Sequence, residues 1–277
     1  MGGVFEDDVG SWEELARSDP LWAVLSSDEF RRSALTSAAE DRFWRSGEEH
    51  VDHVLRILRH ELVPGFEPTV SLDFGCGVGR ALIPLAARSA YAVGLDASKT
   101  MIQRCEDRIA DCAVSNAAAA LVDRRIGAAD VERWGPIDFI HSVLVFQHIV
   151  ADQGFALFDQ LLELLVPGGC GFVQFHSRSP GGEVARAVKA LRFRSHRFNS
   201  LALKSRIPAL RDVVMLYEYD VLDLLRHLAA HRISDVVVER IDTGRGGYDV
   251  RLYFAKFNGS EEAFELAGSQ MKIRSRP

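Results

Sequence analysis

Apolar positions at the start of the chain recur at spacings of three and four, which is the period of an amphipathic helix. Two short helices are expected there, one over residues 11–20 and one that begins at Ser27. A longer helix is expected over residues 46–62, where one face is apolar: Val51, Val54, Leu55, Leu58 and Leu62. The pattern therefore predicts an N-terminal helical extension over residues 1–66.

From residue 70 the pattern changes to short apolar runs that alternate with helical segments. Strands are predicted at 70–75, 91–96, 137–146 and 170–176, with a weaker one near 125–127. Helices are predicted at 80–88, 98–112 and 154–165. Strands joined through helices form a mostly parallel sheet with right-handed crossovers. This alternation predicts an α/β core over residues 67–177.

The end of the chain departs from the alternation. Residues 235–241 and 248–257 are predicted strands joined by a short glycine-rich turn, so they are expected to be antiparallel neighbours. With a helix near Val221, they make residues 216–258 the C-terminal part of the core. Residues 259–277 are expected to be a partly disordered tail. The predicted sheet is thus mostly parallel and ends in an antiparallel hairpin.

Three alternate glycines stand between the first strand and its helix, in the segment LDFGCGVGR over residues 72–80. Glycines let the backbone turn tightly and approach a ligand closely. A dinucleotide site needs G-x-G-x-x-G, and Arg80 or Leu82 stands where the third glycine would be, which argues against a nicotinamide oxidoreductase. The carboxylate of Asp73 would repel a pyrophosphate but suits a cationic amino group.

This segment resembles the first motif of the class I methyltransferases that depend on S-adenosylmethionine. The resemblance implies a Rossmann-like fold, methyl transfer as the activity and S-adenosylmethionine as the cofactor. It also implies that the cofactor is held by Asp73, Gly75, Cys76, Gly77 and Gly79.

Five later residues match positions that bind the cofactor in this family. Asp96 ends the second strand, about 20 positions beyond the glycine turn, where a carboxylate can accept hydrogen bonds from ribose hydroxyls. Ala97 follows it, and Met101 resembles the family's apolar contact to adenine, although an ordinary core methionine is an equal interpretation. Asp130, followed by Val131, resembles the acidic residue that bonds the adenine amino group, with a plain loop aspartate as the alternative.

The fourth and fifth strands carry the candidates for the methyl-transfer end of the site. Ser142 and Val143 are expected to lie beside the methyl donor. His148 and His176 are the candidate general bases, because imidazole titrates near neutral pH. A purely structural histidine remains the alternative for both. The Pro167–Gly168–Gly169 turn before the fifth strand is also typical of the superfamily.

Composition narrows the choice of partners. The chain of 277 residues is 47% hydrophobic with a net charge of -6, which disfavours nucleic acid. The four cysteines show no metal-ligand spacing, and no metal is expected. The acidic N-terminus does not resemble a signal peptide, and no apolar run is long enough to span a membrane. A cytoplasmic location is the expectation.

A basic segment follows the fifth strand and is a candidate acceptor cap over residues 178–215. Residues 178–211 hold nine Lys or Arg and one acidic residue, Glu183. Such a field would attract an anionic small-molecule acceptor, and a solvated helix face is the alternative.

The predicted function is methyl transfer from S-adenosylmethionine to O or N of a small metabolite. An RNA or protein methyltransferase is one alternative. The sequence SVLVFQH over 142–148 stands where base N-methylation would need Asn/Asp-Pro-Pro-aromatic. A non-catalytic, cofactor-binding partner subunit is the other alternative. The acceptor and the oligomeric state stay open.

Overall fold

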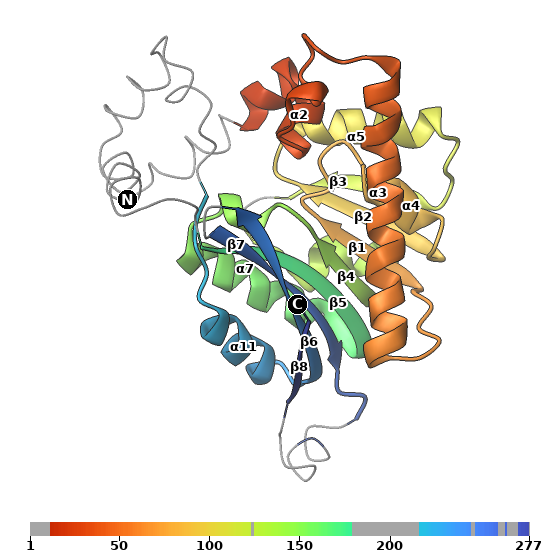
Figure 1. The fold of residues 1–277 in the computed structure, drawn as a ribbon. Helices are drawn as coiled ribbons and strands as arrows, with labels where there is room; N and C mark the ends of the chain where they lie inside the picture. Colours follow the sequence, from red (N-terminus) through yellow and green to blue (C-terminus); the bar gives the residue numbers. More distant parts are fainter. Residues whose placement is uncertain are drawn as a thin grey trace.

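The computed structural model of the chain describes residues 12–122, 125–178, 216–244, 247–259, 264 and 271–276. Within these residues, eight strands form one sheet in the order β3-β2-β1-β4-β5-β7-β6-β8 (Figure 1). The strands are β1 Val70–Phe74, β2 Tyr91–Asp96, β3 Ala117–Leu121, β4 Ile137–Ser142, β5 Leu165–Arg178, β6 Ile233–Gly244, β7 Gly247–Lys256 and β8 Lys272–Arg276.

The strands from β3 to β5 pair in parallel, whereas β7 is antiparallel to both β5 and β6. The predicted parallel sheet with an antiparallel end is therefore confirmed. The chain order reverses between β1 and β4, so the connections that leave these two strands diverge. A crevice at the carboxyl ends of the strands is expected at such a point.

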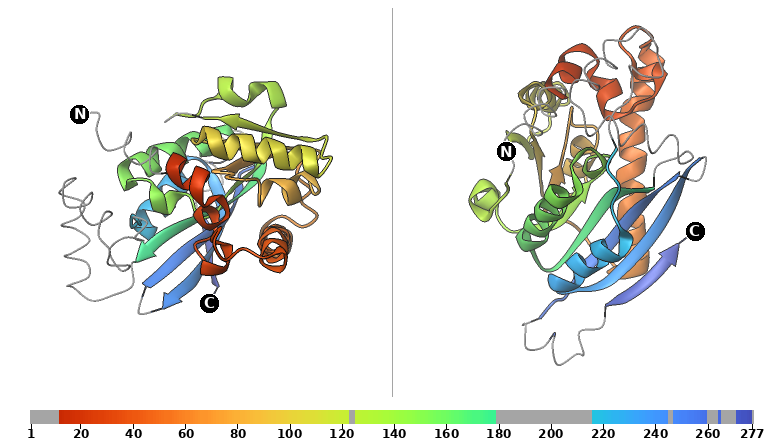
Figure 2. Two further views of the ribbon diagram at one scale, coloured as in Figure 1. Left: turned by 90° about the horizontal axis from the view of Figure 1, so that it is seen from above. Right: turned by 90° about the vertical axis from the view of Figure 1, so that its left-hand side faces the viewer.

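Helices cover both faces of the sheet. The helices are α2 Pro20–Val24, α3 Ser37–Ile57, α4 Leu82–Ala86, α5 Lys99–Asp111, α6 Ala128–Val131, α7 Ala151–Leu164 and α11 Val221–Ala230, with short turns η1 Asp28–Phe30, η2 Leu58–Leu62, η3 Glu132–Trp134 and η4 Phe146–His148. One core cluster joins the sheet to α7 and α11, and a second joins it to α3, α4 and α5 (Figures 1 and 2). No helix in the described part of the chain is long and apolar enough to cross a membrane.

Alternation along β1 sends its side chains to different layers. Val70, Leu72 and Phe74 belong to the cluster beneath α7 and α11. Ser71 and Asp73, which alternate with them, are buried as well. Because neighbouring side chains of a strand point to opposite faces, Asp73 faces the layer of α3, α4 and α5.

The N-terminal extension is helical, but its main helix begins earlier than expected. The helix α3 starts at Ser37 rather than near residue 46, because Thr36 caps it by accepting a hydrogen bond from the backbone N–H of Ala39 at 3.2 Å. The segment from Ser27 forms only the short turn η1. A third apolar cluster, which includes Phe30, Phe43 and Met101, fastens the extension to α5.

Two strands differ from the sequence prediction. The third strand is β3, not residues 125–127, and it pairs with β2 through small alanine side chains at the edge of the sheet. Within the tail, for which no strand was predicted, residues 272–276 form β8 in parallel with β6. Arg274 supports this strand through a hydrogen bond to the carbonyl oxygen of Glu61. The basic segment lies outside the described residues from position 179 to its end.

Candidate active site

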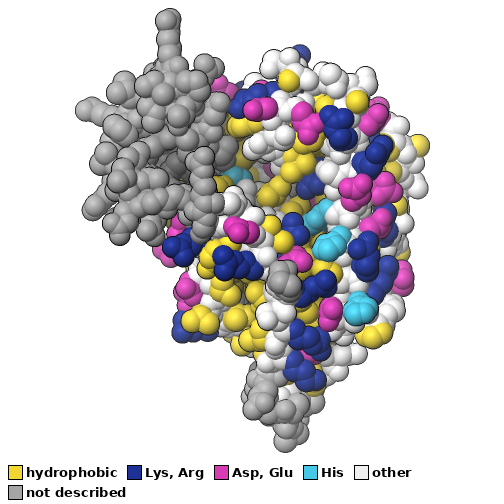
Figure 3. Space-filling model, viewed as in Figure 1, with side chains coloured by type: hydrophobic (Ala, Val, Ile, Leu, Met, Phe, Trp, Pro, Cys, Tyr) yellow, Lys and Arg dark blue, Asp and Glu magenta, His cyan; other side chains and the backbone are white. Residues whose placement is uncertain are grey.

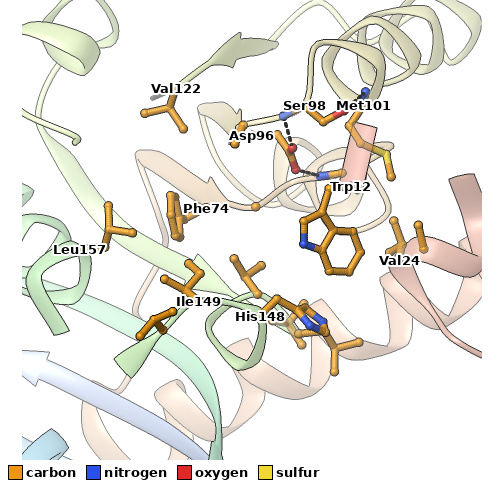
Figure 4. A pocket seen from close by; sticks show the side chains of 18 residues that line it. Trp12, Val24, Phe74, Asp96, Ser98, Met101, Val122, His148, Ile149 and Leu157 are labelled. Carbon is orange, nitrogen blue, oxygen red and sulfur yellow. Dashed lines mark hydrogen bonds between the residues drawn. The ribbon is translucent and has the colours of Figure 1, made fainter. Parts of the chain in front are cut away.

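A cavity lies beyond the carboxyl ends of β1, β2 and β4, at the point where the sheet order reverses. It is lined by Trp12, Ala23, Val24, Phe74, Gly75, Gly77, Asp96, Ala97, Ser98, Met101, Val122, Val143, Leu144, Val145, His148, Ile149, Val150 and Leu157 (Figure 4). The predicted site residues in this wall are Gly75, Gly77, Asp96, Ala97, Met101, Val143 and His148.

The glycine turn passes so close to its neighbours that a side chain would not fit. Gly75 has φ +75°, and a Cβ there would lie 2.2 Å from Cγ2 of Val145. Gly77 has φ +54°, and a Cβ there would lie 2.9 Å from Cγ2 of Val24. Both residues line the cavity, so the turn presents bare backbone to whatever occupies it.

Asp96 holds the glycine turn against the start of α5. Its Oδ2 accepts a hydrogen bond from the backbone N–H of Gly77, and its Oδ1 accepts one from that of Ser98, both at 2.9 Å (Figure 4). Burial raises the pKa of Asp96, and these two N–H groups oppose the rise. The carboxylate is therefore fixed in place, and each oxygen keeps a lone pair for a further donor.

The rest of the cavity is mainly apolar. In Figure 4, Val122, Leu157 and Ile149 are on the side of Phe74, and Met101 is on the opposite side, near Val24. A slot of this kind beside a fixed carboxylate suits a flat heterocycle attached to a sugar, because the few polar groups set the orientation of such a ligand.

The N-terminal extension closes one side of the cavity. Trp12 packs against His148 with ring centroids 4.6 Å apart. Glu13 accepts hydrogen bonds from the hydroxyls of Ser98 at 2.6 Å and Thr100 at 2.5 Å. These bonds lower the pKa of Glu13 to about 2. The extension is thus fastened to the first turn of α5, directly beside the cavity.

One wall residue has a strained backbone. Leu144 follows β4 and has φ +62°, a conformation that is costly for a branched side chain. Such outliers cluster at active sites. The surrounding structure, and not the backbone preference of Leu144, therefore sets the conformation of this loop.

Asp73 is not part of this wall. It is 2% exposed, and its Oδ1 lies 2.7 Å from Nδ1 of His141. Its Oδ2 is buried without a hydrogen-bond partner among the described residues. A buried acceptor of this kind is uncommon in native proteins. Because Phe74 and Gly75 line the cavity, Asp73 stands just behind its floor.

Three other predicted residues also lie outside the cavity wall. Cys76 is buried, and its pKa is raised by a hydrogen bond with Cys105 and by burial. Gly79 has φ +87° and completes the turn. The hydroxyl of Ser142 donates to the carbonyl oxygen of Phe74 at 2.9 Å, which ties β4 to β1.

Asp130 and Val131 take up structural positions in the computed structure. Asp130 accepts a hydrogen bond from the backbone N–H of Gly127 at 2.8 Å and so caps α6. Val131 belongs to the core beneath α7. Neither lines the cavity, whereas Val122, which the sequence did not single out, does.

The two candidate bases lie in different surroundings. His148 is in the cavity wall, and its Nε2 lies 2.9 Å from Nε2 of Gln147. His176 is 2% exposed at the end of β5, and its Nδ1 lies 2.7 Å from Oδ1 of Asp249 on β7. Gln174 donates to the other oxygen of Asp249 at 2.9 Å.

Comparison with known proteins supports the family assignment. Residues 72–170 match the protein family described as a methyltransferase domain. Residues 72–170 therefore form a methyltransferase domain, which covers less than half of the chain. The match begins in β1 and ends in β5, so the methyltransferase domain includes the glycine turn, Asp96 and the loop after β4. No curated protein matches the chain in sequence.

Solved structures share the fold of this methyltransferase domain at low sequence identity. The magnesium protoporphyrin IX methyltransferase of Synechocystis PCC 6803, with bound SAH, has a TM-score of 0.55 and 19% identity over 89% of this chain and 99% of its own. The N-methyltransferase NodS of Bradyrhizobium japonicum WM9, in complex with S-adenosylhomocysteine, has a TM-score of 0.56 and 14% identity over 90% of this chain and 98% of its own. The same magnesium protoporphyrin IX methyltransferase was also solved with bound SAM. These ligands are the predicted cofactor and its demethylated product.

Proposed function

We propose that this protein transfers the methyl group of S-adenosylmethionine to an oxygen or nitrogen of a small metabolite. One observation carries the proposal: the Asp96 carboxylate is fixed by two backbone N–H groups beside a bare glycine turn, at the edge of an apolar cavity. In this arrangement the carboxylate suits the ribose, the bare glycine turn suits the chain that carries the sulfur, and the apolar cavity suits the adenine.

The residues present fit the cofactor at each end. Asp96 has the lone pairs to accept from the ribose hydroxyls, and the apolar part of the wall, which includes Met101 and Val122, offers a contact for adenine. The unpartnered Oδ2 of Asp73 suits the ammonium group of the methionyl end. The bound cofactor would supply a methyl group already activated on a sulfonium, so positioning and exclusion of water are the main tasks left to the protein.

We propose that either His148 or His176 acts as a general base and removes the proton from the oxygen or nitrogen atom that is methylated. His148 is favoured by its place in the cavity wall, and His176 by its orientation, because Asp249 holds Nδ1 and so fixes the tautomer. Replacing each in turn with Asn separates them. Loss of the base lowers kcat and removes the acidic limb of the pH–rate profile, while the affinity for S-adenosylhomocysteine stays unchanged. The histidine whose replacement leaves this limb intact has a structural role.

The proposal that the acceptor is anionic rests on the charge of residues 178–211 in the sequence alone. A cytoplasmic location likewise stays a prediction. Both remain separate from the proposed reaction, since methyl transfer needs neither.

Transfer of labelled methyl from S-adenosylmethionine is the test of the function. Purified protein is incubated with three sets of acceptors: small hydroxyl and amino compounds, each in a neutral and a phosphorylated or carboxylated form; RNA; and unrelated proteins. Label in a small compound supports the proposal, and a preference for the charged form supports an anionic acceptor. Label only in RNA or protein would replace the proposal with that alternative. Binding of the cofactor with no transfer in any set would indicate a non-catalytic subunit.

A further inference from the structure

A series of three polar side chains, two buried and one half-buried, links the N-terminal extension to the first strand. Asp73 on β1 contacts Nδ1 of His141 on β4 at 2.7 Å, and Nε2 of His141 lies 2.9 Å from Nε2 of His50 on α3. His141 is 0% exposed, and Figure 3 shows histidine and charged side chains gathered beside α3 on this side of the molecule. Because the two histidines are separated by 91 positions, their spacing gives no hint of the contact.

The protons in this series follow from its chemistry. Asp73 accepts from Nδ1 of His141, so this histidine carries a proton on the side of the carboxylate. The contact between the two Nε2 atoms needs one proton, donated by one ring to the other. Burial and the charges of His141, Arg80 and Arg251 hold the pKa of His50 well below its ordinary value, so His50 is neutral at pH 7.

Burying these polar side chains costs folding free energy, which a role in the site would explain. Both histidines lie against the aromatic ring of Phe172, which stacks on His141 at 5.3 Å with an interplanar angle of 21° and lies 5.2 Å from the ring of His50. Apolar residues of similar size would pack there at least as well. Among the described residues, Oδ2 of Asp73 has no hydrogen-bond partner, and a buried carboxylate oxygen without a partner destabilises the fold.

We propose that His141 and His50 are positioning residues that hold the Asp73 carboxylate with Oδ2 toward the ammonium group of the bound cofactor. The proposal rests on the proposed function. Because Oδ1 is bonded to His141, rotation of the carboxylate would break that bond, and Oδ2 remains the oxygen available to the ammonium group, next to the wall residues Phe74 and Gly75. His50 fixes the ring of His141 from the other side and thereby couples α3 to the cofactor motif. Burial lowers the pKa of Arg80, which is 5% exposed, and the charge of Asp73 opposes this change, so the two side chains interact electrostatically.

The test compares two ligands that differ only at the end that Asp73 would contact. S-adenosylhomocysteine carries the amino-acid group, whereas 5′-methylthioadenosine has the same nucleoside and sulfur without it. Calorimetry gives both affinities for the wild type and for H141F, which keeps an aromatic ring against Phe172 but donates nothing to Asp73. We expect H141F to bind S-adenosylhomocysteine about tenfold more weakly and methylthioadenosine unchanged.

Three further variants separate positioning from packing. H141N restores a side-chain N–H donor near the place of Nδ1 and should recover most of the affinity for S-adenosylhomocysteine. H50L leaves the bond to Asp73 intact and should show a smaller loss than H141F. H60Q changes an exposed histidine beyond the end of α3 and should change neither affinity.

The results distinguish failure of the positioning role from failure of the proposed function. A loss that H141F shows equally for both ligands, or no loss at all, overturns the positioning role, as does an H141N variant that binds no better than H141F. A wild type that binds both ligands equally well also overturns it and leaves the proposed function standing. A wild type that binds neither ligand overturns the proposed function, and the positioning role with it. Retained binding of methylthioadenosine shows directly that a variant is folded.

Discussion

Replacing Asp96 with Ala tests the junction between the glycine turn and α5. The change leaves the backbone N–H groups of Gly77 and Ser98 without the carboxylate that each contacts at 2.9 Å. A hydrogen bond to a charged group contributes about 1.5–3 kcal/mol. Because Asp96 is only partly buried, we take the lower value for each bond, so the free energy of unfolding should fall by about 3 kcal/mol.

Thermal unfolding with and without S-adenosylhomocysteine measures both consequences of this change. A loss of about 3 kcal/mol should lower Tm by roughly 6–10 °C in a chain of this size. Ligand at about 100 times its Kd should stabilise the wild type by about 2.7 kcal/mol, and the Asp96→Ala variant by much less, because the acceptor for the ribose hydroxyls is gone. Asp96→Asn keeps one acceptor oxygen and should lose about half as much.

The matched control is Asp111→Ala, which removes an exposed aspartate from the last turn of α5. A carboxylate at the C-terminus of a helix does not stabilise it, so this variant should melt as the wild type and keep its full response to ligand. Our reasoning on Asp96 would be refuted by an Asp96→Ala variant with an unchanged Tm. If Asp96→Ala lowers Tm but the variant is still stabilised fully by the ligand, Asp96 stabilises the junction but does not contact the ribose.

The other two predictions concern the turn and the extension. Gly75→Ala should abolish binding of S-adenosylhomocysteine, because its Cβ would lie 2.2 Å from Cγ2 of Val145 and the residue has φ +75°; calorimetry that gives the wild-type affinity would contradict this. Glu13→Gln should speed hydrogen exchange in residues 12–18 at pH 7. The pKa of Glu13 is lowered to about 2 by Ser98 and Thr100, so the stability it contributes is present above about pH 4.5 and is lost as the pH falls toward 2. If the variant exchanges faster than the wild type by the same factor at every pH, the negative charge of Glu13 is not the cause of the protection.

Much of the core could be predicted from the sequence because it rests on local signals. The strands β1, β2 and β4 are short apolar runs that begin close to where their patterns do. The antiparallel pair β6 and β7 follows from two alternating runs joined by a short turn. The glycines and Asp96 lie in one stretch of chain, so their spacing is enough to predict that they meet.

The rest depended on contacts between distant parts of the chain. The strand β3 consists of alanines and one leucine at the sheet edge, so neither its apolar pattern nor its β-propensity is strong. The strand β8 is polar and forms only because β6 offers a free edge. The contact of His50 with His141, and the closure of the cavity by Trp12, depend on how α3 and the extension pack. A histidine on a helix face gives no sign of its partner.

The same limit applies to Asp73 and Asp130, which the motifs predict to contact the cofactor although neither lines the cavity: Asp73 is buried behind its wall and Asp130 is exposed. Asp73 is committed to His141, and Asp130 caps its own helix. Their roles toward the cofactor stay predictions, which the ligand comparison above tests for Asp73.

The most direct measurement of the central claim is calorimetric titration of the purified protein with S-adenosylmethionine, S-adenosylhomocysteine and NAD in parallel. The site described here predicts that both sulfur nucleosides bind, that Asp96→Ala weakens both, and that NAD does not bind, because the turn lacks the third glycine of a dinucleotide site. Binding of NAD alone, or binding of the sulfur nucleosides that is indifferent to Asp96, would contradict it.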